Sequence, residues 1–187
     1  MKLLNIEKLV ESKFLNMYKL KLINRKGNPK DYYVASRRKK EELSCVTRNH
    51  SRCDGVMVLP IYNGNEVIIV KQYRPAISDY LYELPAGIVD EGETIEKAAK
   101  REIFEETGLN SKNLEIILKP SYTSVGLCDE TTAIVKMDVY GTISTEHNED
   151  DEEIDVIKLK IDEVEQFVKN HNFSIKSALL LLYALKK

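Results

Sequence analysis

The sequence predicts a mixed α/β sandwich with helices outside a sheet. Three observations predict it: short apolar runs typical of strands, one amphipathic segment with helical spacing in mid-chain, and two more helical segments at the C-terminal end. The strand-like and helix-like segments alternate irregularly, which favours a mixed sandwich. The length of 187 residues suits one domain of ordinary size, or a core domain with a small appendage.

The first 50 residues are rich in charge and predict two short strands with connectors. Residues 14–23 alternate loosely between apolar and polar side chains, and residues 24–29 are a cluster of turn-forming types. Residues 31–36 have the composition of a returning strand. Residues 37–42 run from basic to acidic, and such runs are usually solvated.

The hydrophobic pattern becomes clearer from Gly55 onward. Two apolar runs flank Asn63-Gly64, a pair of residues that predicts a hairpin turn. Residues 94–107 predict a helix, with Thr94 as its N-cap and Gly108 just past its end. Three strands and then two helices are expected in the rest of the chain, near residues 114–118, 132–139, 156–161, 162–169 and 174–185.

Composition excludes several classes of protein. The net charge of −2 gives no electrostatic reason to expect nucleic acid or a membrane as the main partner. The longest apolar run, residues 178–185, is too short to span a bilayer, and charges near the N-terminus interrupt any signal-like run. Cys45, Cys53 and Cys128 match neither a zinc spacing nor a disulfide framework, so we expect free thiols in a reducing cytoplasm.

The most informative stretch is residues 87–109. On the helix expected there, Glu102 and Glu106 are four residues apart and Glu105 lies between them, so the carboxylates share one face, roughly 5–6 Å apart at Cβ. Like charges at this spacing oppose helix formation unless a cation neutralises them, and Mg²⁺ suits carboxylates that also hold substrate phosphates. Taken alone, the three glutamates are more often a solvated helix face.

The whole stretch resembles the Nudix box: Gly, five residues, Glu, seven residues, Arg-Glu, an aliphatic residue, any residue, Glu-Glu, any residue, Gly, aliphatic. Such a set of coincidences has a chance on the order of 10⁻⁹ per window. Every specified position is present: Gly87, Glu93, Arg101, Glu102, Ile103, Glu105, Glu106, Gly108 and Leu109. The chain is therefore identified as a member of the Nudix superfamily, whose expected fold is an α/β/α sandwich with a mixed sheet.

Two segments before the box resemble the Nudix branch that hydrolyses ADP-ribose and related nucleotide sugars. They are Lys71-Gln-Tyr-Arg-Pro75 and Tyr82-Glu-Leu-Pro-Ala-Gly87. The resemblance implies a small antiparallel β unit over residues 1–50, for dimerisation and base binding, and a catalytic domain over residues 51–187. Because that N-terminal unit usually packs across a homodimer, the resemblance implies a homodimer.

The resemblance also implies a metal site. Glu102 and Glu106 would be the principal Mg²⁺ ligands, Glu105 would assist, and the backbone carbonyl of Ala86 would complete the site, with Mn²⁺ as a substitute. Arg101 would organise these acids together with Glu93.

The resemblance further implies residues that act on the substrate. Arg74 would contact the diphosphate or the terminal sugar, and Glu83 lies in the same pocket. The general base of this branch often lies on a loop before a late strand. Here that loop is residues 146–155, in which Glu152 matches the base and Glu153 is the alternative. The other interpretation of so acidic a loop is exposed charge.

Recognition of the nucleobase is less clearly indicated. This branch stacks adenine between aromatic side chains, often tryptophans, and this chain has no Trp. Phe14 and Tyr33 lie near the corresponding places, although either could be a core or surface aromatic. Arg38, or its neighbour Arg37, matches an arginine that reaches the partner subunit's ligand. Gly126 belongs to a substrate loop that reads Ser-Val-Gly, where ADP-ribose enzymes often have Ser-Pro-Gly.

The implied reaction is Mg²⁺-dependent hydrolysis of a nucleotide-sugar diphosphate, with ADP-ribose cut to AMP and ribose 5-phosphate. Two alternatives remain open. One is another Nudix specificity: a UDP- or GDP-sugar, or a damaged nucleoside triphosphate. The other is a catalytically silent Nudix fold that binds nucleotide as a sensor, which the loss of a box glutamate would have favoured.

Overall fold

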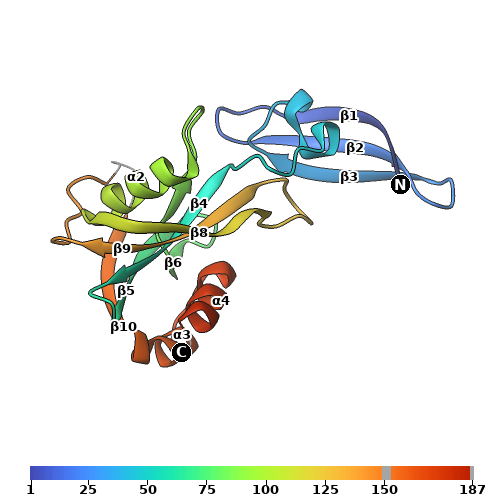
Figure 1. Cartoon of the computed structure of the whole chain (residues 1–187). Helices are drawn as coiled ribbons and strands as arrows, with labels where there is room; N and C mark the ends of the chain where they lie inside the picture. The colour runs from blue at the N-terminus through green and yellow to red at the C-terminus, as the bar shows by residue number, and fades with distance from the viewer. Residues whose placement is uncertain (149–152, 186–187) are drawn as a thin grey trace. The chain divides into compact units, whose positions relative to one another are not determined.

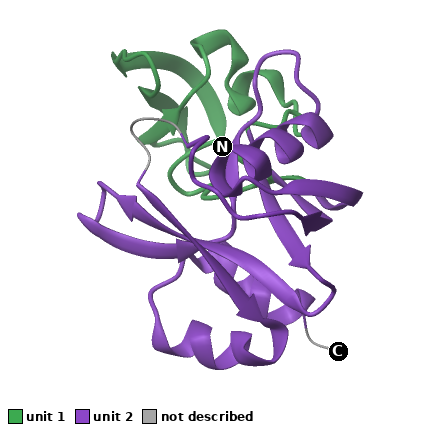
Figure 2. Cartoon of the chain, turned by 90° about the vertical axis from the view of Figure 1, so that its left-hand side faces the viewer, with its two compact units in different colours: residues 1–54, 120–132 green, residues 55–119, 133–187 purple. Residues whose placement is uncertain are grey.

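The computed structural model describes residues 1–148 and 153–185, and the chain divides into two compact units. Figure 2 colours them separately. The first unit consists of Met1–Asp54 and Pro120–Thr132, and the second of Gly55–Lys119 and Ala133–Lys187. The segment Pro120–Thr132 therefore belongs to the compact unit of the N-terminal residues, a grouping that no sequence pattern indicates.

The first unit is built on an antiparallel sheet of strands β1 (Lys2–Val10), β2 (Asn16–Ile23) and β3 (Pro29–Ser36), in that order (Figure 1). The short helices η1 (Lys40–Glu42) and α1 (Ser44–Thr47) follow. One face of the sheet packs into a small core of Ile6, Tyr18, Leu20 and Leu43.

Strand β1 lies in a segment where the sequence predicts no strand. Its apolar and polar residues do not alternate in the sequence. Of the apolar residues, Ile6 is buried, whereas Leu4, Leu9 and Val10 are exposed. Pairing with β2 makes this segment a strand, with two irregularities in its register.

The larger sheet has the order β10-β5-β4-β9-β8, and β6 and β7 pair with β5 and β4. Its described strands are β4 (Gly55–Tyr62), β5 (Glu66–Arg74), β6 (Asp79–Glu83), β7 (Ala86–Ile88), β8 (Asn110–Tyr122), β9 (Thr131–Tyr140) and β10 (Ile154–Lys160). Strands β6 and β7 are not among the strands expected from the sequence, because both are short and lie near Pro75 and Pro85.

Helix α2 (Ile95–Thr107) covers one face of this sheet, and α3 (Val164–Asn170) with α4 (Ile175–Ala184) covers the other (Figure 1). The short helix η2 (Ile161–Glu163) precedes α3. Val56, Val58 and Ile68 pack beneath α2, whereas the alternate residues Met57 and Leu59 pack beneath α4. Because side chains alternate across a strand, the apolar run of β4 is buried on both faces. The predicted α/β/α sandwich is confirmed.

Several local predictions are also confirmed. Asn63 and Gly64 have φ angles of 50° and 76° and join β4 to β5 as a hairpin. Thr94 caps α2 by accepting a hydrogen bond from the Lys97 N–H, and Gly108 ends the helix at φ 70°. The described residues contain no helix of the length and hydropathy needed to cross a membrane.

Candidate active site

The site begins with the polar edge of α2. Ala98, Ala99 and Ile103 anchor the helix in the core. The helical spacing places Glu102 and Glu106 beside this apolar stripe, where they are 9% and 2% exposed. Two buried carboxylates one turn apart repel each other unless cations or hydrogen-bond donors lie nearby.

Arg101 holds the acids of the box in place. Its guanidinium donates to both carboxylate oxygens of Glu93 (3.2 and 3.0 Å), to Glu102 (2.8 Å), to Glu105 (3.0 Å) and to the carbonyl of Ile88 (2.8 Å). The hydrogen bond to Glu93, with these neighbouring carboxylates, raises the pKa of Arg101 above its ordinary value, and the same bond lowers the pKa of Glu93. The arginine therefore ties the loop before α2 to the acidic face of the helix.

Strand β7 brings a backbone segment against the two buried acids. The Ala86 N–H lies 3.4 Å from Oε1 of Glu106. A Cβ atom added to Gly87 would lie 2.0 Å from the carboxylate carbon of Glu102. Pairing of Ala86 and Gly87 with Met57 and Val56 of β4 fixes this approach.

These residues fit a divalent cation. The carboxylates of Glu102 and Glu106 lie beside the backbone of Ala86 and Gly87 and supply oxygen donors, which hard cations prefer. Within residues 1–148 and 153–185, no three acidic, His or Cys side chains already stand in a metal-binding arrangement. In this structure the Arg101 guanidinium forms ion pairs with both Glu102 and Glu105.

A second charged pair lies on the same face of the sheet. Arg74 ends β5, and its Nε donates to Oε2 of Glu83, at the end of β6, over 2.6 Å. Residues 68 and 74 of β5 are separated by an even number, and Ile68 packs beneath α2, so Arg74 also faces the α2 side. Arg74 is 42% exposed in its side chain and available to an anion.

Glu153 lies on the other face. Its carbonyl accepts the Tyr73 N–H (3.1 Å), and its carboxylate accepts the Tyr80 hydroxyl. Tyr73 is one residue from Arg74 on β5 and therefore faces the α3–α4 side. This position does not support Glu153 as a general base. Glu152 lies outside the described residues.

A family model described as NUDIX domain matches residues 51–180. The chain belongs to the Nudix family. This confirms the family prediction from the 87–109 stretch, and the matched range extends beyond that stretch in both directions.

Two relatives show how far the Nudix similarity reaches. The chain is 35% identical over 118 residues to a methanol dehydrogenase activator of Bacillus methanolicus, covering 61% of this chain and 62% of that protein. It is 35% identical over 98 residues to an ADP-ribose pyrophosphatase of Saccharomyces cerevisiae, covering 48% and 42%. The chain thus spans about half the length of these relatives.

A solved structure confirms the Nudix fold. The crystal structure of an ADP compounds hydrolase superposes with a TM-score of 0.78, covering 98% of this chain and 92% of that one, at 19% identity. An identity this low is informative about the fold alone.

The predicted base-binding residues of this Nudix chain lie in the first unit. Phe14 and Tyr33 are 65% and 52% exposed, so neither is a core aromatic. The Lys13 ammonium lies 4.9 Å from the centre of the Phe14 ring. The carbonyl of Gly126 accepts the Tyr32 hydroxyl over 2.6 Å, which ties the 124–126 loop to β3.

Arg38 is buried at 2% exposure, so the expectation that residues 37–42 are solvated is wrong at this residue. Its guanidinium pairs with Asp54 (Nε to Oδ1, 3.2 Å) and Asp129 (3.3 Å) and also donates to Ser44. A buried arginine persists because carboxylates compensate its charge. This arrangement does not support Arg38 as a substrate ligand, whereas Arg37 is 43% exposed in its side chain.

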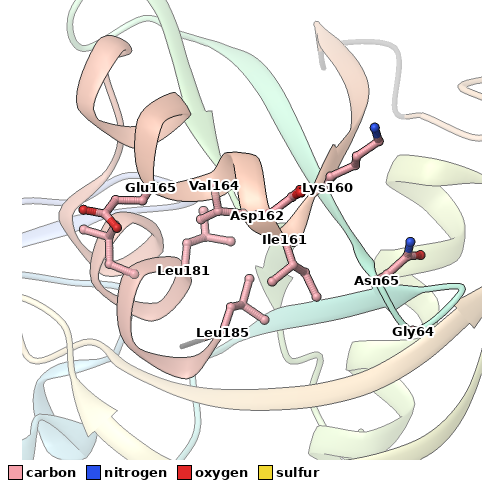
Figure 3. A pocket seen from close by; sticks show the side chains of 10 residues that line it. Gly64, Asn65, Lys160, Ile161, Asp162, Val164, Glu165, Leu181 and Leu185 are labelled. Carbon is pink, nitrogen blue, oxygen red and sulfur yellow. The ribbon is translucent and has the colours of Figure 1, made fainter. Parts of the chain in front are cut away.

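Two further features are not evident in the sequence. The Ser177 hydroxyl of α4 accepts a hydrogen bond from the Leu84 N–H, just before Ala86. A single serine in an apolar helical segment does not indicate such a contact in the sequence. A cavity of about 470 Å³ lies between the β4–β5 turn and the C-terminal helices (Figure 3), with Ile161, Val164 and Leu181 among its lining residues. None of the predicted site residues lines this cavity.

Proposed function

We propose that this chain is a Mg²⁺-dependent hydrolase that cleaves the diphosphate linkage of a nucleotide sugar, with ADP-ribose cut to AMP and ribose 5-phosphate. The observation that carries this proposal is the convergence of Glu102 and Glu106 on the backbone of Ala86 and Gly87. Names of relatives, such as ADP-ribose pyrophosphatase, support the choice of substrate class.

Glu102, Glu106 and the Ala86 carbonyl would hold Mg²⁺, with Glu105 assisting and Mn²⁺ as a substitute. When bound, the cation neutralises phosphate charge and activates water. Arg101 would orient the metal-binding acids, because it forms ion pairs with Glu93, Glu102 and Glu105. The burial of Glu106 favours a cation, since a desolvated carboxylate gains more from one than an exposed carboxylate does.

Arg74 would bind the diphosphate. Its guanidinium faces the α2 side, and its ion pair with Glu83 holds it in one orientation. A planar guanidinium matches phosphate oxygens in two-point contacts, which orient the bridging oxygen for in-line displacement.

Glu152 is proposed as the general base that removes a proton from the attacking water. The resemblance of the 146–155 loop to the ADP-ribose branch supports Glu152, and its alternative Glu153 is bound by Tyr80 on the opposite face of the sheet. In the balanced reaction, the water oxygen bonds to one phosphorus, the bridging P–O bond breaks, and the two products share the protons of water.

The first unit would supply the nucleobase site and the homodimer contact. The exposed rings of Phe14 and Tyr33 support stacking on a purine, because aromatic side chains that serve the core are buried. Residues 1–50 and 51–187 would then divide base binding from catalysis.

A substrate panel tests the proposal. With Mg²⁺, the purified chain is incubated with ADP-ribose, ADP-glucose, UDP-glucose, GDP-mannose, NADH, a dinucleoside polyphosphate and 8-oxo-dGTP, and phosphatase-coupled release is read. Preference for ADP-ribose supports the full proposal. No turnover of any compound, together with tight nucleotide binding, would replace it with a sensor role.

A second specificity rests on one observation in the sequence. The 124–126 loop reads Ser-Val-Gly and lacks the proline of many ADP-ribose enzymes, and the chain contains no Trp. Preference for a UDP- or GDP-sugar in the same panel would keep the metal chemistry and discard adenine stacking by Phe14 and Tyr33.

A further inference from the structure

We infer that Ser177 of α4 is a positioning residue for the metal and diphosphate site, although it lies on the far side of the sheet from α2. This inference rests on the proposed function, and it names a residue that acts through the backbone of Glu83–Ala86. Ser177 is fully buried, and its Oγ accepts the Leu84 N–H over 2.9 Å.

The backbone of β6 explains why a side chain is needed there. The Tyr82 N–H donates to the Asn172 carbonyl (2.9 Å), and the Tyr82 carbonyl accepts the Ser174 N–H (3.3 Å). The α3–α4 connection therefore pairs with the outer edge of β6, opposite β5. Because N–H groups alternate along a strand, the Leu84 N–H points to this same outer edge.

The Leu84 N–H has no backbone acceptor from the α3–α4 connection, because helix α4 begins directly after Ser174. The Ser174 carbonyl accepts the Ala178 N–H in the first turn of α4, and the Leu84 N–H donates to the Ser177 hydroxyl instead. Leu84 is 1% exposed and has no access to water. The Ser177 hydroxyl replaces the lost carbonyl, since a buried N–H without an acceptor is strongly unfavourable.

The supported segment joins two parts of the proposed site. Glu83 pairs with Arg74 just before Leu84. The Pro85 carbonyl accepts the Val58 N–H (2.8 Å) just after it, and Ala86 then meets Glu106. Between these anchors, Leu84 is held from outside the sheet by Ser177, so a shift at Leu84 moves the Glu83 carboxylate and the Ala86 carbonyl together.

Ser177→Ala tests the inference, and Ser174→Ala is the matched control. The Ser174 hydroxyl donates to Ser177 Oγ (2.9 Å) and makes no cap of its own, so its loss leaves the Leu84 contact intact. We expect Ser177→Ala to lower kcat and Mn²⁺ affinity, each on the order of tenfold, as outer-shell losses at metal sites do. Amide hydrogen exchange at Leu84 should accelerate in Ser177→Ala and not in Ser174→Ala.

Ser177→Thr keeps the hydroxyl. Compared with Ser177→Ala, it should bind Mn²⁺ more tightly and exchange the Leu84 amide more slowly. The inference is overturned if Ser177→Ala matches Ser174→Ala in kcat, Mn²⁺ affinity and Leu84 exchange. It is equally overturned if Ser177→Ala lowers only the melting temperature. Two of the readouts need no substrate: Mn²⁺ binding, measured by electron paramagnetic resonance, and amide exchange at Leu84. A wild-type chain that is inactive on every nucleotide sugar would therefore reject the proposed function, while these two readouts still test the role of Ser177.

Discussion

The carboxylate of Glu102 occupies the space where a side chain on Gly87 would begin, with its carbon and Oε1 both 2.0 Å from an added Cβ. Gly87→Ala should therefore force the carboxylate away. Because the obstructing group is the end of a flexible side chain, the fold should survive. We expect kcat to fall about 10²-fold, as a misplacement of about 1 Å can do.

Thermal melting and kcat are measured together on Gly87→Ala. A melting temperature close to wild type with a large loss of kcat is the expected pair of results. Wild-type turnover in this variant would show that the position of the Glu102 carboxylate does not matter for catalysis.

Glu106→Gln should keep the fold and lose turnover. The amide is nearly the same size but removes the negative charge that would attract the cation, and we expect kcat to fall by about 10²-fold or more. Glu96→Gln is the control, because Glu96 lies exposed in the first turn of the same helix. Equal Mn²⁺ affinity in the two variants would rule out Glu106 as a ligand.

Glu152→Gln and Glu153→Gln should separate the two candidate bases. Loss of a general base lowers kcat by about 10²- to 10⁴-fold, which we expect for Glu152→Gln with nucleotide binding kept. Glu153→Gln should change kcat by about twofold or less, because its carboxylate is held by Tyr80 on the other face of the sheet. The reverse result would move the base by one residue. Pre-steady-state release of product with each variant is the measurement.

Gly108→Ala should destabilise the second unit. The residue has φ 70°, and an added Cβ would lie 2.9 Å from the backbone N and O of Ser144. We expect the free energy of unfolding to fall by about 2 kcal/mol or more. Gly64→Ala shares a positive φ of 76° with open space around it, so it should cost only about 1 kcal/mol. Urea unfolding compares them, and equal costs would mean that the Ser144 contact contributes nothing.

Arg38→Met should strongly destabilise the first unit. Removing the guanidinium takes away the buried cation shared by Asp54 and Asp129 and leaves Asp54 only its 3.4 Å pair with the exposed Arg52; breaking a buried pair typically costs about 3–5 kcal/mol. Arg37→Met is the control, since its 3.6 Å pair with Glu130 is solvent-exposed and contributes about 1 kcal/mol or less. If Arg38→Met instead raised KM at unchanged stability, Arg38 would be a substrate ligand after all.

Local chemistry explains which predictions from the sequence are confirmed. Asn63-Gly64 and Gly108 satisfy backbone conformations that few residues adopt, so their types alone indicate a turn and a helix end. The spacing of the box acids likewise follows from 3.6 residues per helical turn. The strand β1 has no such signal, because its pairing with β2 and not its own pattern decides its conformation.

The sequence by itself determined the Nudix family, the sandwich fold and the acidic face of α2, because these follow from short-range spacing. Only the tertiary structure decided that Arg38 is buried, that Glu153 faces away from Arg74, and that Ser177 supports Leu84. These contacts join residues far apart in the chain. Burial and hydrogen-bond partners at such separations depend on which strands pair and which helices cover them, and no local pattern of residue types records that information.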